Sequence, residues 1–435
     1  MPDGRPNVVL IVTHDTGRQL GCYGRPVQTP HLDQVAVQGI RFAGHFSVAA
    51  QCSPSRAALM TGRWPHCNGM MGLAPRWGYR QGERTLAHHL AAAGYETVLF
   101  GLQHEGVDPR LLGYGTSYTE LAANGFRYRD GAVSPGMVLA DQASAWIRQR
   151  QGGRRRPYLL VLGLAETHRP WDRPEYGDAG PDEAVAGSVP PYLPDDPRVR
   201  DELARFHAAV RFADRVVGEV RSAVDSGPEV DRTLLLFTVD HGVAFPRAKG
   251  MSYDPGLESA LVVRWPDRVA AGQVRGELLC NLDVLPTLLE AVGIPVPSEV
   301  QGRSFLGLLT GGPYTPRSDI RFGMTWHDDY NPHRGIRTSH HKYIRNFGDL
   351  PRVFLPADIA RSPSGAAVRD LWPEGERPAE ELYALDTDPW EQCNRAADPA
   401  CAALLEDLRG RVDRWMAATG DPLRDGPVAL PPAVR

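Results

Sequence analysis

Short, continuously apolar segments recur along the chain, and stretches with a helical pattern of apolar residues separate them. Such segments are typical of strands buried on both faces, because a strand with one wet face alternates apolar and polar residues. Strands separated by helices pair in parallel, since the helix returns the chain to the same end of the sheet. The expected strands cover residues 7–13, 95–100, 158–164, 233–239 and 260–264.

Helical patterns fill the intervals and follow the last strand, at residues 29–38, 85–93, 141–151, 201–224 and 283–292. The alternation predicts an α/β fold, with a large, mostly parallel sheet sandwiched by helices. The 435 residues are enough for one such domain and a smaller appendage. We therefore expect a large catalytic domain over residues 1–310 and a smaller α+β subdomain over 311–435. The subdomain is expected to hold a small antiparallel sheet and a helix over 402–417.

Potential metal ligands follow four of the predicted strands. They are His14 and Asp15, then His104, then His168, and finally Asp240 and His241. The carboxyl ends of parallel strands line one edge of a sheet, where ligands bind, so we expect these side chains to converge. Any single one could instead be a helix cap or part of a solvated loop. Four together predict a metal site made of carboxylates and imidazoles.

A single thiol, Cys52, lies just before a short helical pattern and four residues before Arg56. Pro54 and Ser55 can open a helix, because proline tolerates the first turn and serine satisfies free amides there. The partial positive charge of a helix N-terminus favours an anion. These residues are consistent with an activated cysteine, an anion site or a small buried apolar residue.

The segment at residues 52–62 reads CSPSRAALMTG and contains the pattern Cys-x-Pro-x-Arg. It resembles the signature of the formylglycine-dependent sulfatases, which belong to the alkaline phosphatase superfamily. Other stretches, over nearly the whole chain, are similar to the same family and above all to its sulfamidase-like members, the N-sulfoglucosamine sulfohydrolases. They cover residues 6–12, 14–15, 21–24, 29–33, 66–73, 240–246 and 381–391. The resemblance implies the sulfatase fold and hydrolysis of a sulfate ester or sulfamate.

The resemblance also implies a role for several residues of the signature and the strand ends. Cys52 would be oxidised by a formylglycine-generating enzyme, and the hydrated aldehyde would be both the nucleophile and a metal ligand. Asp15 and Asp240 would bind one divalent metal ion as carboxylates. Arg56 would steady the formylglycine and its charge.

Other residues would contact the nucleophile or the substrate by the same resemblance. His104 and His168 fall where family histidines contact the nucleophile or the sulfuryl group. Lys249 falls where a basic residue binds the sulfate and assists the leaving group. In a dense polar loop farther along, His327 and Arg334 could pair with a sugar or aryl substrate, although a structured surface turn is an equal alternative.

Three residues depart from the family pattern. His14 replaces the first aspartate of a pair, His241 replaces the commonest asparagine, and Leu102 stands where many sulfatases carry a lysine. The family implies Ca²⁺, which prefers oxygen ligands, whereas imidazole suits Mn²⁺ or Zn²⁺ better. We expect His14 and His241 among the metal ligands.

Two other functions remain open from the same residues. The pair Asp240 and His241 is usual in related phosphonate monoester and phosphodiester hydrolases, which predicts such an activity on the same scaffold. His14 and Leu102 are also compatible with a degenerate homologue that only binds its ligand, although the intact signature argues against this.

Composition excludes several classes of partner. A net charge of −4 provides no electrostatic footprint for nucleic acid. No window reaches the apolar length of a membrane span, and no secretory signal precedes the first strand, so we expect a cytoplasmic protein. The six cysteines are scattered and do not form a disulfide framework. The expected partners are a small sulfated sugar or aryl substrate, the formylglycine-generating enzyme and a second copy in a possible homodimer.

Overall fold

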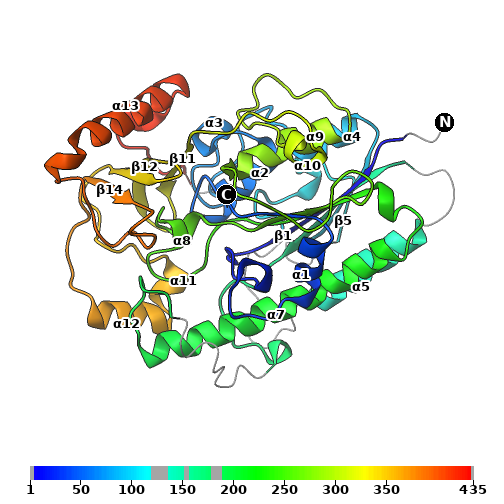
Figure 1. Ribbon diagram of the computed structural model, residues 1–435, viewed down its shortest axis with the longest axis horizontal. Helices are drawn as coiled ribbons and strands as arrows, with labels where there is room; N and C mark the ends of the chain where they lie inside the picture. The colour runs from blue at the N-terminus through cyan, green and yellow to red at the C-terminus, as the bar shows by residue number, and fades with distance from the viewer. Residues whose placement is uncertain (1–3, 119–135, 151–155, 178–188, 433–435) are drawn as a thin grey trace.

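The computed structural model describes residues 4–118, 136–150, 156–177 and 189–432. In these residues, eight strands form the main sheet in the order β5-β4-β6-β1-β7-β8-β2-β9. Helices cover both faces of this sheet (Figure 1). The strands are β1 (Asn7–Thr13), β2 (Ile40–Phe42), β4 (Glu96–Gly101), β5 (Thr116–Tyr118), β6 (Tyr158–Leu164), β7 (Thr233–Val239), β8 (Leu261–Arg264) and β9 (Gln273–Arg275).

The pairing of the strands confirms the mostly parallel sheet. β1 pairs in parallel with β6 and β7, and β6 pairs in parallel with β4. β8 is the exception, since it runs antiparallel to both β7 and β2. Every residue of β1, β6 and β7 is buried, which explains why these strands read as continuous apolar runs.

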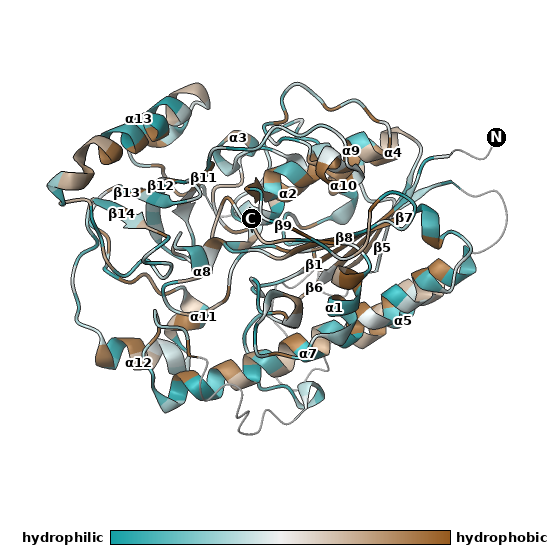
Figure 2. Ribbon diagram, in the orientation of Figure 1, coloured by the Kyte–Doolittle hydropathy of each residue, from teal (hydrophilic) through white to brown (hydrophobic). Residues whose placement is uncertain are grey.

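Alternate residues of β1 face two separate cores. Val9 and Ile11 pack into the core beneath three helices, which are α1 (Pro30–Val37), α5 (Gly136–Gln149) and α7 (Pro197–Asp225). Val8 and Leu10 pack into the opposite core, which is covered by α2 (Cys52–Thr61), α4 (Leu86–Ala92), α9 (Val284–Ala291) and α10 (Leu306–Thr310). Figure 2 shows the central strands as hydrophobic, whereas α7 alternates hydrophobic and hydrophilic residues along its length. This is the pattern of an amphipathic helix that covers a sheet.

Several predicted boundaries move by a few residues. The helix expected over 201–224 begins at Pro197, because Asp196 caps it by accepting a hydrogen bond from the amide of Arg198. The helix expected over 141–151 extends over Gly136–Gln149. The helix expected over 283–292 divides into a 3-10 turn, η5 (Asn281–Asp283), and α9.

The C-terminal part contains an antiparallel sheet of four strands among the described residues, β11-β12-β13-β14. They are β11 (Ile320–Trp326), β12 (Tyr330–Arg337), β13 (His341–Asn346) and β14 (Glu380–Ala384). Helix α13 (Ala402–Ala418) packs on this sheet, as Figure 1 shows. The hydrophobic core under this sheet joins Phe322 and Leu382 of the sheet to Phe46 and Met251 of the larger part. The division at residue 310 stays a prediction.

Short elements complete the described chain. Strand β3 (His45–Phe46) pairs with β10 (Leu279–Cys280). The short helices are α3 (Pro65–Asn68), α8 (Asp254–Leu257), α11 (Ala357–Ala360) and α12 (Pro363–Leu371). The 3-10 turns are η1 (Gly21–Tyr23), η2 (Pro109–Leu112), η3 (Pro174–Tyr176), η4 (Val230–Arg232), η5 (Asn281–Asp283), η6 (Pro399–Cys401) and η7 (Pro422–Arg424). Among the described helices, none combines the length and apolar character needed to cross a membrane.

Candidate active site

The ends of β1, β4, β6 and β7 meet at one edge of the main sheet, where the backbone turns sharply. Asp15 follows β1 with a φ of 49°, and His104 follows β4 with a φ of 56°. Left-handed backbone is uncommon for residues other than glycine and persists where the surrounding structure enforces it. The amide of Asp15 donates a hydrogen bond of 2.9 Å to Oδ1 of Asp240, which joins the ends of β1 and β7.

The predicted signature helix, α2, is present and begins at Cys52 itself, slightly earlier than the sequence pattern placed it, and all of its residues are buried. Its polar residues are satisfied by neighbouring elements. The Asn281 side-chain amide donates to the Ser55 carbonyl at 2.8 Å, and the Ser47 hydroxyl donates to the Ser55 hydroxyl at 2.8 Å. The Ser55 hydroxyl in turn donates to the carbonyl of Asp240. Helix α2 is therefore attached directly to the end of β7.

Five potential ligands converge where α2 meets this edge of the sheet. One ligand atom from each lies within 4.8 Å of all the others, and all five residues are buried. The residues, called here the ligand cluster, are His14, Asp15, Cys52, Asp240 and His241. Asp15 Oδ1 lies 2.9 Å from His14 Nδ1 and 3.0 Å from His241 Nε2. Residues distant in sequence are thus brought to one point by the sheet topology.

The cluster has the lone-pair oxygen and nitrogen atoms that a divalent cation requires as ligands. Asp15 Oδ1 and His241 Nε2 are buried and make no hydrogen bond with the described residues, although they face each other. Buried polar atoms are otherwise nearly always satisfied, so two converging lone-pair atoms fit a cation between them. Two carboxylates with two imidazoles form a mixed set, which suits Mn²⁺ or Zn²⁺ better than an all-oxygen set would.

The protonation states of the cluster are those of metal ligands. Burial alone would raise the pKa of Asp15, but Lys249 and His14 hold it well below its usual value. The pKa of Asp240 is also lowered, because His14, His241 and Arg56 outweigh the effect of burial. Burial lowers the pKa of His14, which favours the neutral ring that binds a metal. Burial raises the pKa of Cys52 well above its usual value, so the unmodified thiol is not an activated thiolate.

Two buried cations flank the cluster. Arg56, from the first turns of α2, places Nε 3.1 Å from Asp240 Oδ2 and is 3% exposed. Lys249 places Nζ 2.9 Å from Asp15 Oδ2. Burial alone would lower the pKa of Lys249, but the carboxylates of Asp15 and Asp358 raise it well above its usual value. Both side chains therefore carry positive charge beside the ligand cluster.

The two predicted histidines both lie near His14 of the cluster. His168 Nε2 lies 3.3 Å from Lys249 Nζ, and the His168 ring lies 4.8 Å from the His14 ring. The His104 ring lies 6.0 Å from the His14 ring. Burial lowers the pKa of His168 to about 4 and that of His104 well below its usual value, so both are neutral at pH 7.

The structure adds one carboxylate that sequence reasoning missed, Asp358 of α11. Its Oδ2 accepts a hydrogen bond of 2.8 Å from Lys249 Nζ, and its side chain is 20% exposed. Asp328 Oδ2 accepts a hydrogen bond of 2.6 Å from the amide of Ala357, which fixes the start of α11. Asp358 is 109 residues from Lys249 in the chain, so no local pattern signals their contact.

The two residues predicted to contact substrate from the C-terminal part have different surroundings. His327 is held by its own neighbour, with Nδ1 3.0 Å from Asp328 Oδ2, and so lies beside the start of α11. Its substrate-binding role stays a prediction. Arg334 requires a correction, because its guanidinium is 2% exposed and forms a bidentate pair with Asp421.

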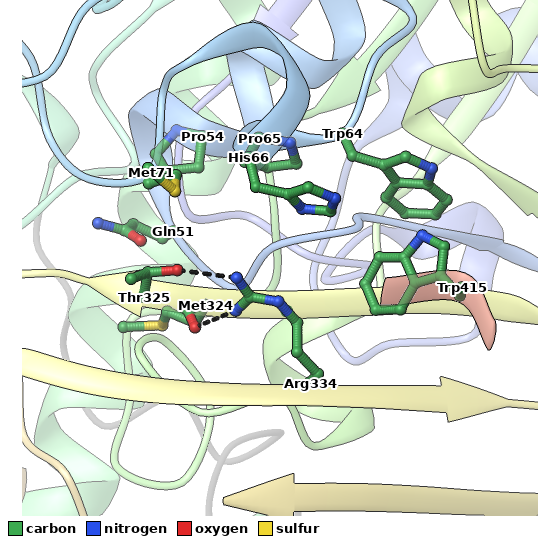
Figure 3. A pocket seen from close by; sticks show the side chains of 11 residues that line it. Gln51, Pro54, Trp64, Pro65, His66, Met71, Met324, Thr325, Arg334 and Trp415 are labelled. Carbon is green, nitrogen blue, oxygen red and sulfur yellow. Dashed lines mark hydrogen bonds between the residues drawn. The ribbon is translucent and has the colours of Figure 1, made fainter. Parts of the chain in front are cut away.

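Figure 3 shows where Arg334 points. Its guanidinium donates to the carbonyl of Met324 at 2.6 Å and to the hydroxyl of Thr325 at 3.1 Å. The cavity beside it, bordered by Gln51 and Pro54, measures about 10 Å³, which is room for about one water molecule. Arg334 is therefore a structural residue behind the signature helix and cannot contact substrate there.

Comparison with known proteins is consistent with this geometry. The family described as Sulfatase matches residues 6–294, and the family described as N-sulphoglucosamine sulphohydrolase, C-terminal, matches residues 244–364. The chain is 28% identical over 439 residues to an ulvan-active sulfatase of Formosa agariphila, covering 98% of this chain and 83% of that one. It is 29% identical over 466 residues to human N-sulphoglucosamine sulphohydrolase, covering 96% of this chain and 91% of that one.

Solved structures have the same fold. One is a protein bound to its substrate D-glucosamine-2-N,6-O-disulfate, with a TM-score of 0.73, 19% identity and coverage of 96% of this chain and 98% of that one. Another is the phosphonate monoester hydrolase of Agrobacterium radiobacter, with a TM-score of 0.74, 19% identity and coverage of 95% and 96%. The sulfatase match spans more than half of the chain and includes the ligand cluster. The chain therefore belongs to the sulfatase family and is a sulfuric ester hydrolase.

Proposed function

We propose that this enzyme hydrolyses a sulfate ester or sulfamate, with sulfamidase-like specificity, through a formylglycine made from Cys52. The observation that carries the proposal is the convergence of Asp15, Cys52 and Asp240 within 4.8 Å, flanked by buried cationic groups. Cys52 is 2% exposed, so the formylglycine-generating enzyme must reach it before the chain has folded. The cytoplasmic location and a homodimer remain part of the same proposal.

The residues suited to hold a divalent cation are Asp15, Asp240, His14 and His241, together with the modified side chain at position 52. With the divalent cation and the formylglycine in place, the cation would neutralise the sulfuryl oxygens. The aldehyde hydrate would supply the attacking hydroxyl. Family resemblance favours Ca²⁺, whereas the two imidazoles favour Mn²⁺ or Zn²⁺.

Lys249 is the group best suited to give a proton to the leaving group. Nδ1 of His168 lies 2.6 Å from the carbonyl of Arg169, and a carbonyl only accepts, so this nitrogen carries the ring proton. Nε2 of His168 is then a lone-pair acceptor that faces the Lys249 ammonium at 3.3 Å. Lys249 is charged and His168 is neutral, so the lysine is the acid and the histidine orients it.

Arg56 and His104 complete the assignment. Arg56 is buried against Asp240, where its charge steadies the side chain at position 52 and the oxygens of the substrate. His104 is neutral, so it can accept the proton from the second hydroxyl of the aldehyde hydrate and allow release of sulfate.

Asp358 is proposed to recognise the leaving group. One of its oxygens binds Lys249, and its partial exposure leaves the carboxylate accessible from solvent. A carboxylate accepts hydrogen bonds from a sugar hydroxyl or amine but repels a second sulfate. This arrangement favours an amino sugar, and the C-terminal family match at residues 244–364 includes both Lys249 and Asp358.

Mass analysis of the peptide that contains Cys52 tests the proposal. The chain should be produced in a host with the converting enzyme and assayed with N-sulfoglucosamine and nitrophenyl sulfate. We expect the mass decrease of thiol-to-aldehyde conversion and hydrolysis of at least one substrate. An unmodified thiol in such a host would exclude the mechanism.

A second candidate is a phosphonate monoester or phosphodiester hydrolase. The observation in its favour is His241 beside Asp240 in the ligand cluster, where it adds an imidazole. Comparing the catalytic efficiency for nitrophenyl sulfate with that for phenylphosphonate and phosphodiester substrates separates the two. A larger efficiency for the phosphorus compounds would favour this candidate.

A further inference from the structure

A second cavity, of about 390 Å³, lies outside the ligand cluster and shares no residue with it. Its volume falls within the range of small-molecule sites. We call it the arginine pocket and define it by Arg247, Arg352, Arg377, Tyr253, Trp372 and Tyr383, which line it. Tyr383 belongs to β14, one of the two edge strands of the described C-terminal sheet. The pocket thus has both positive charge and aromatic walls.

One acidic residue of the pocket lining, Glu381, already has hydrogen-bond partners on both oxygens. One of its oxygens accepts hydrogen bonds of 2.6 Å from the hydroxyls of both Tyr253 and Tyr383. The other accepts a hydrogen bond of 2.7 Å from the side-chain amide of Asn346. The second acidic residue of the lining, Glu391, pairs with Lys342 at 2.8 Å. Neither carboxylate forms an ion pair with a pocket arginine among the described residues.

Arg377 is a buried cation with unmet hydrogen-bonding capacity. It is 7% exposed, and its Nη1 donates to the amide oxygens of Asn331 at 3.0 Å and Asn346 at 3.4 Å. Within the described chain, its Nε and Nη2 have no hydrogen-bond partner. Both nitrogens are also closed to solvent, so Arg377 acts on the adjoining cavity through its positive charge.

The other two arginines place positive charge around the same space. Arg247 has a left-handed backbone, with a φ of 59°, and its guanidinium lies 4.2 Å from the centroid of the Tyr253 ring. Arg352 is exposed, and its side chain forms no ion pair with any described residue. Trp372 is partly exposed and offers a broad apolar face. The ring face of an aromatic side chain is electron-rich and attracts the weakly positive C–H groups of a sugar.

We propose that the arginine pocket binds an anionic saccharide. The sulfate or carboxylate group of the sugar pairs with the exposed guanidinium of Arg352, and the buried positive charge of Arg377 in the pocket lining attracts the same group. The sugar ring packs on the aromatic wall. This site is separate from hydrolysis and does not require Cys52 to be converted.

Calorimetric titration of the folded chain with glucuronate, glucosamine 6-sulfate and uncharged glucose tests the proposal. Glucuronate has an oxyanion but no sulfuryl group, so it reports on the pocket without turnover. We expect both anionic sugars to bind and glucose to show no binding. Arg352→Ala should weaken the binding of glucuronate about tenfold or more, because it removes the accessible guanidinium, and Arg377→Gln should weaken it severalfold.

Two control variants test whether glucuronate binds in the arginine pocket and not elsewhere. Arg424→Ala removes an exposed arginine outside the pocket and should leave glucuronate binding unchanged. Lys249→Met alters the catalytic site and should also leave it unchanged. Wild-type affinity in both pocket variants, or loss of binding only in Lys249→Met, would overturn the proposal. If Arg377→Gln does not fold, the result for the exposed Arg352→Ala decides. Equal affinity for inorganic sulfate would overturn the assignment to a saccharide.

Discussion

At the residue scale, the site depends on a few buried charges that neutralise each other. Lys249 lies between two carboxylates, those of Asp15 and Asp358, which keep it protonated in a buried position. Such arrangements are rare in protein interiors because an isolated charge is costly to bury. Because these charges compensate each other, Asp15 stays ionised and can bind a cation, and Lys249 stays protonated and can donate to the leaving group. Changing any one member should therefore alter the chemistry of the others.

Replacing Asp358 by asparagine tests its proposed role toward the leaving group. Asp358→Asn loses a charged acceptor, so kcat/KM for N-sulfoglucosamine should fall about 10- to 100-fold, mainly through KM. Nitrophenyl sulfate has no donor on its leaving group and should lose much less. Steady-state kinetics with both substrates measure the difference. An equal loss for the two would show that Asp358 acts only by positioning Lys249.

Glu105 makes the stability of the fold depend on pH. Burial raises the pKa of Glu105 to about 7, and the Tyr79 hydroxyl lies 2.9 Å from its Oε2. The folded state thus binds the proton more tightly than the unfolded state. The stabilisation is fully present below about pH 4.5 and is lost as pH rises towards 7, by about 3 kcal/mol.

The variant Glu105→Gln should remove this dependence. Urea denaturation at pH 5 and pH 8 measures the free energy of unfolding, and we expect the variant to be more stable than the wild type at pH 8. Glu374→Gln, at an exposed position, is the control and should follow the wild type. A wild-type pH slope in Glu105→Gln would assign the effect to other groups.

At the element scale, the strands position the site through the close contact of their ends. The amide of Leu102, just after β4, donates a hydrogen bond of 2.9 Å to the carbonyl of Gly163 near the end of β6. A Cβ at Gly163 would lie 1.7 Å from the Leu102 carbonyl oxygen. Only glycine allows the two strand ends to approach this closely, and His104 follows Leu102 two residues later.

Gly163→Ala should therefore separate the ends of β4 and β6. We expect a loss of about 3 kcal/mol in the free energy of unfolding and, in the folded fraction, a lower kcat because His104 moves. Gly106→Ala is the matched control, since its Cβ would meet its nearest neighbour at an ordinary 3.7 Å. Wild-type stability and kcat in Gly163→Ala would contradict the proposed packing constraint.

At the scale of the whole molecule, the C-terminal sheet supports the signature helix from behind. The Gln51 side-chain amide, at the start of α2, donates to the carbonyl of Trp326 in β11. Arg334 of β12 binds Asp421 after α13, and both side chains are almost completely buried. These contacts connect the C-terminal sheet, helix α13 and the signature helix α2. Loss of the Arg334–Asp421 ion pair should therefore also disturb the position of the residues in the active site.

Arg334→Met should cost about 3–5 kcal/mol of unfolding free energy, because it leaves the Asp421 carboxylate buried and unpaired. The double variant Arg334→Met/Asp421→Leu removes both charges and should recover most of that loss. Chemical denaturation of the single and double variants measures the coupling. A double variant as unstable as Arg334→Met would indicate that packing, not charge, is lost.

Much of the architecture and part of the site could be predicted from local patterns. The apolar runs identified β1, β6 and β7, because a strand buried on both faces must be apolar throughout. The polar residues at the strand ends predicted the ligand cluster, because parallel strands place their carboxyl ends together. The substrate-binding role predicted for Arg334 was wrong, because the sequence around a charged residue looks the same whether that residue binds substrate or a buried carboxylate.

The sequence by itself determined the class of fold, the signature helix and which residues lie at the ends of the central strands, since these depend on periodicity and neighbouring residues. Only the tertiary structure decided which charges meet. Lys249 contacts Asp358 across 109 residues of chain, and Arg377 is buried with two unmet donors beside a cavity whose lining comes from segments far apart in sequence. Electrostatic partners are set by distance in space, and distance between remote segments is a property of packing alone.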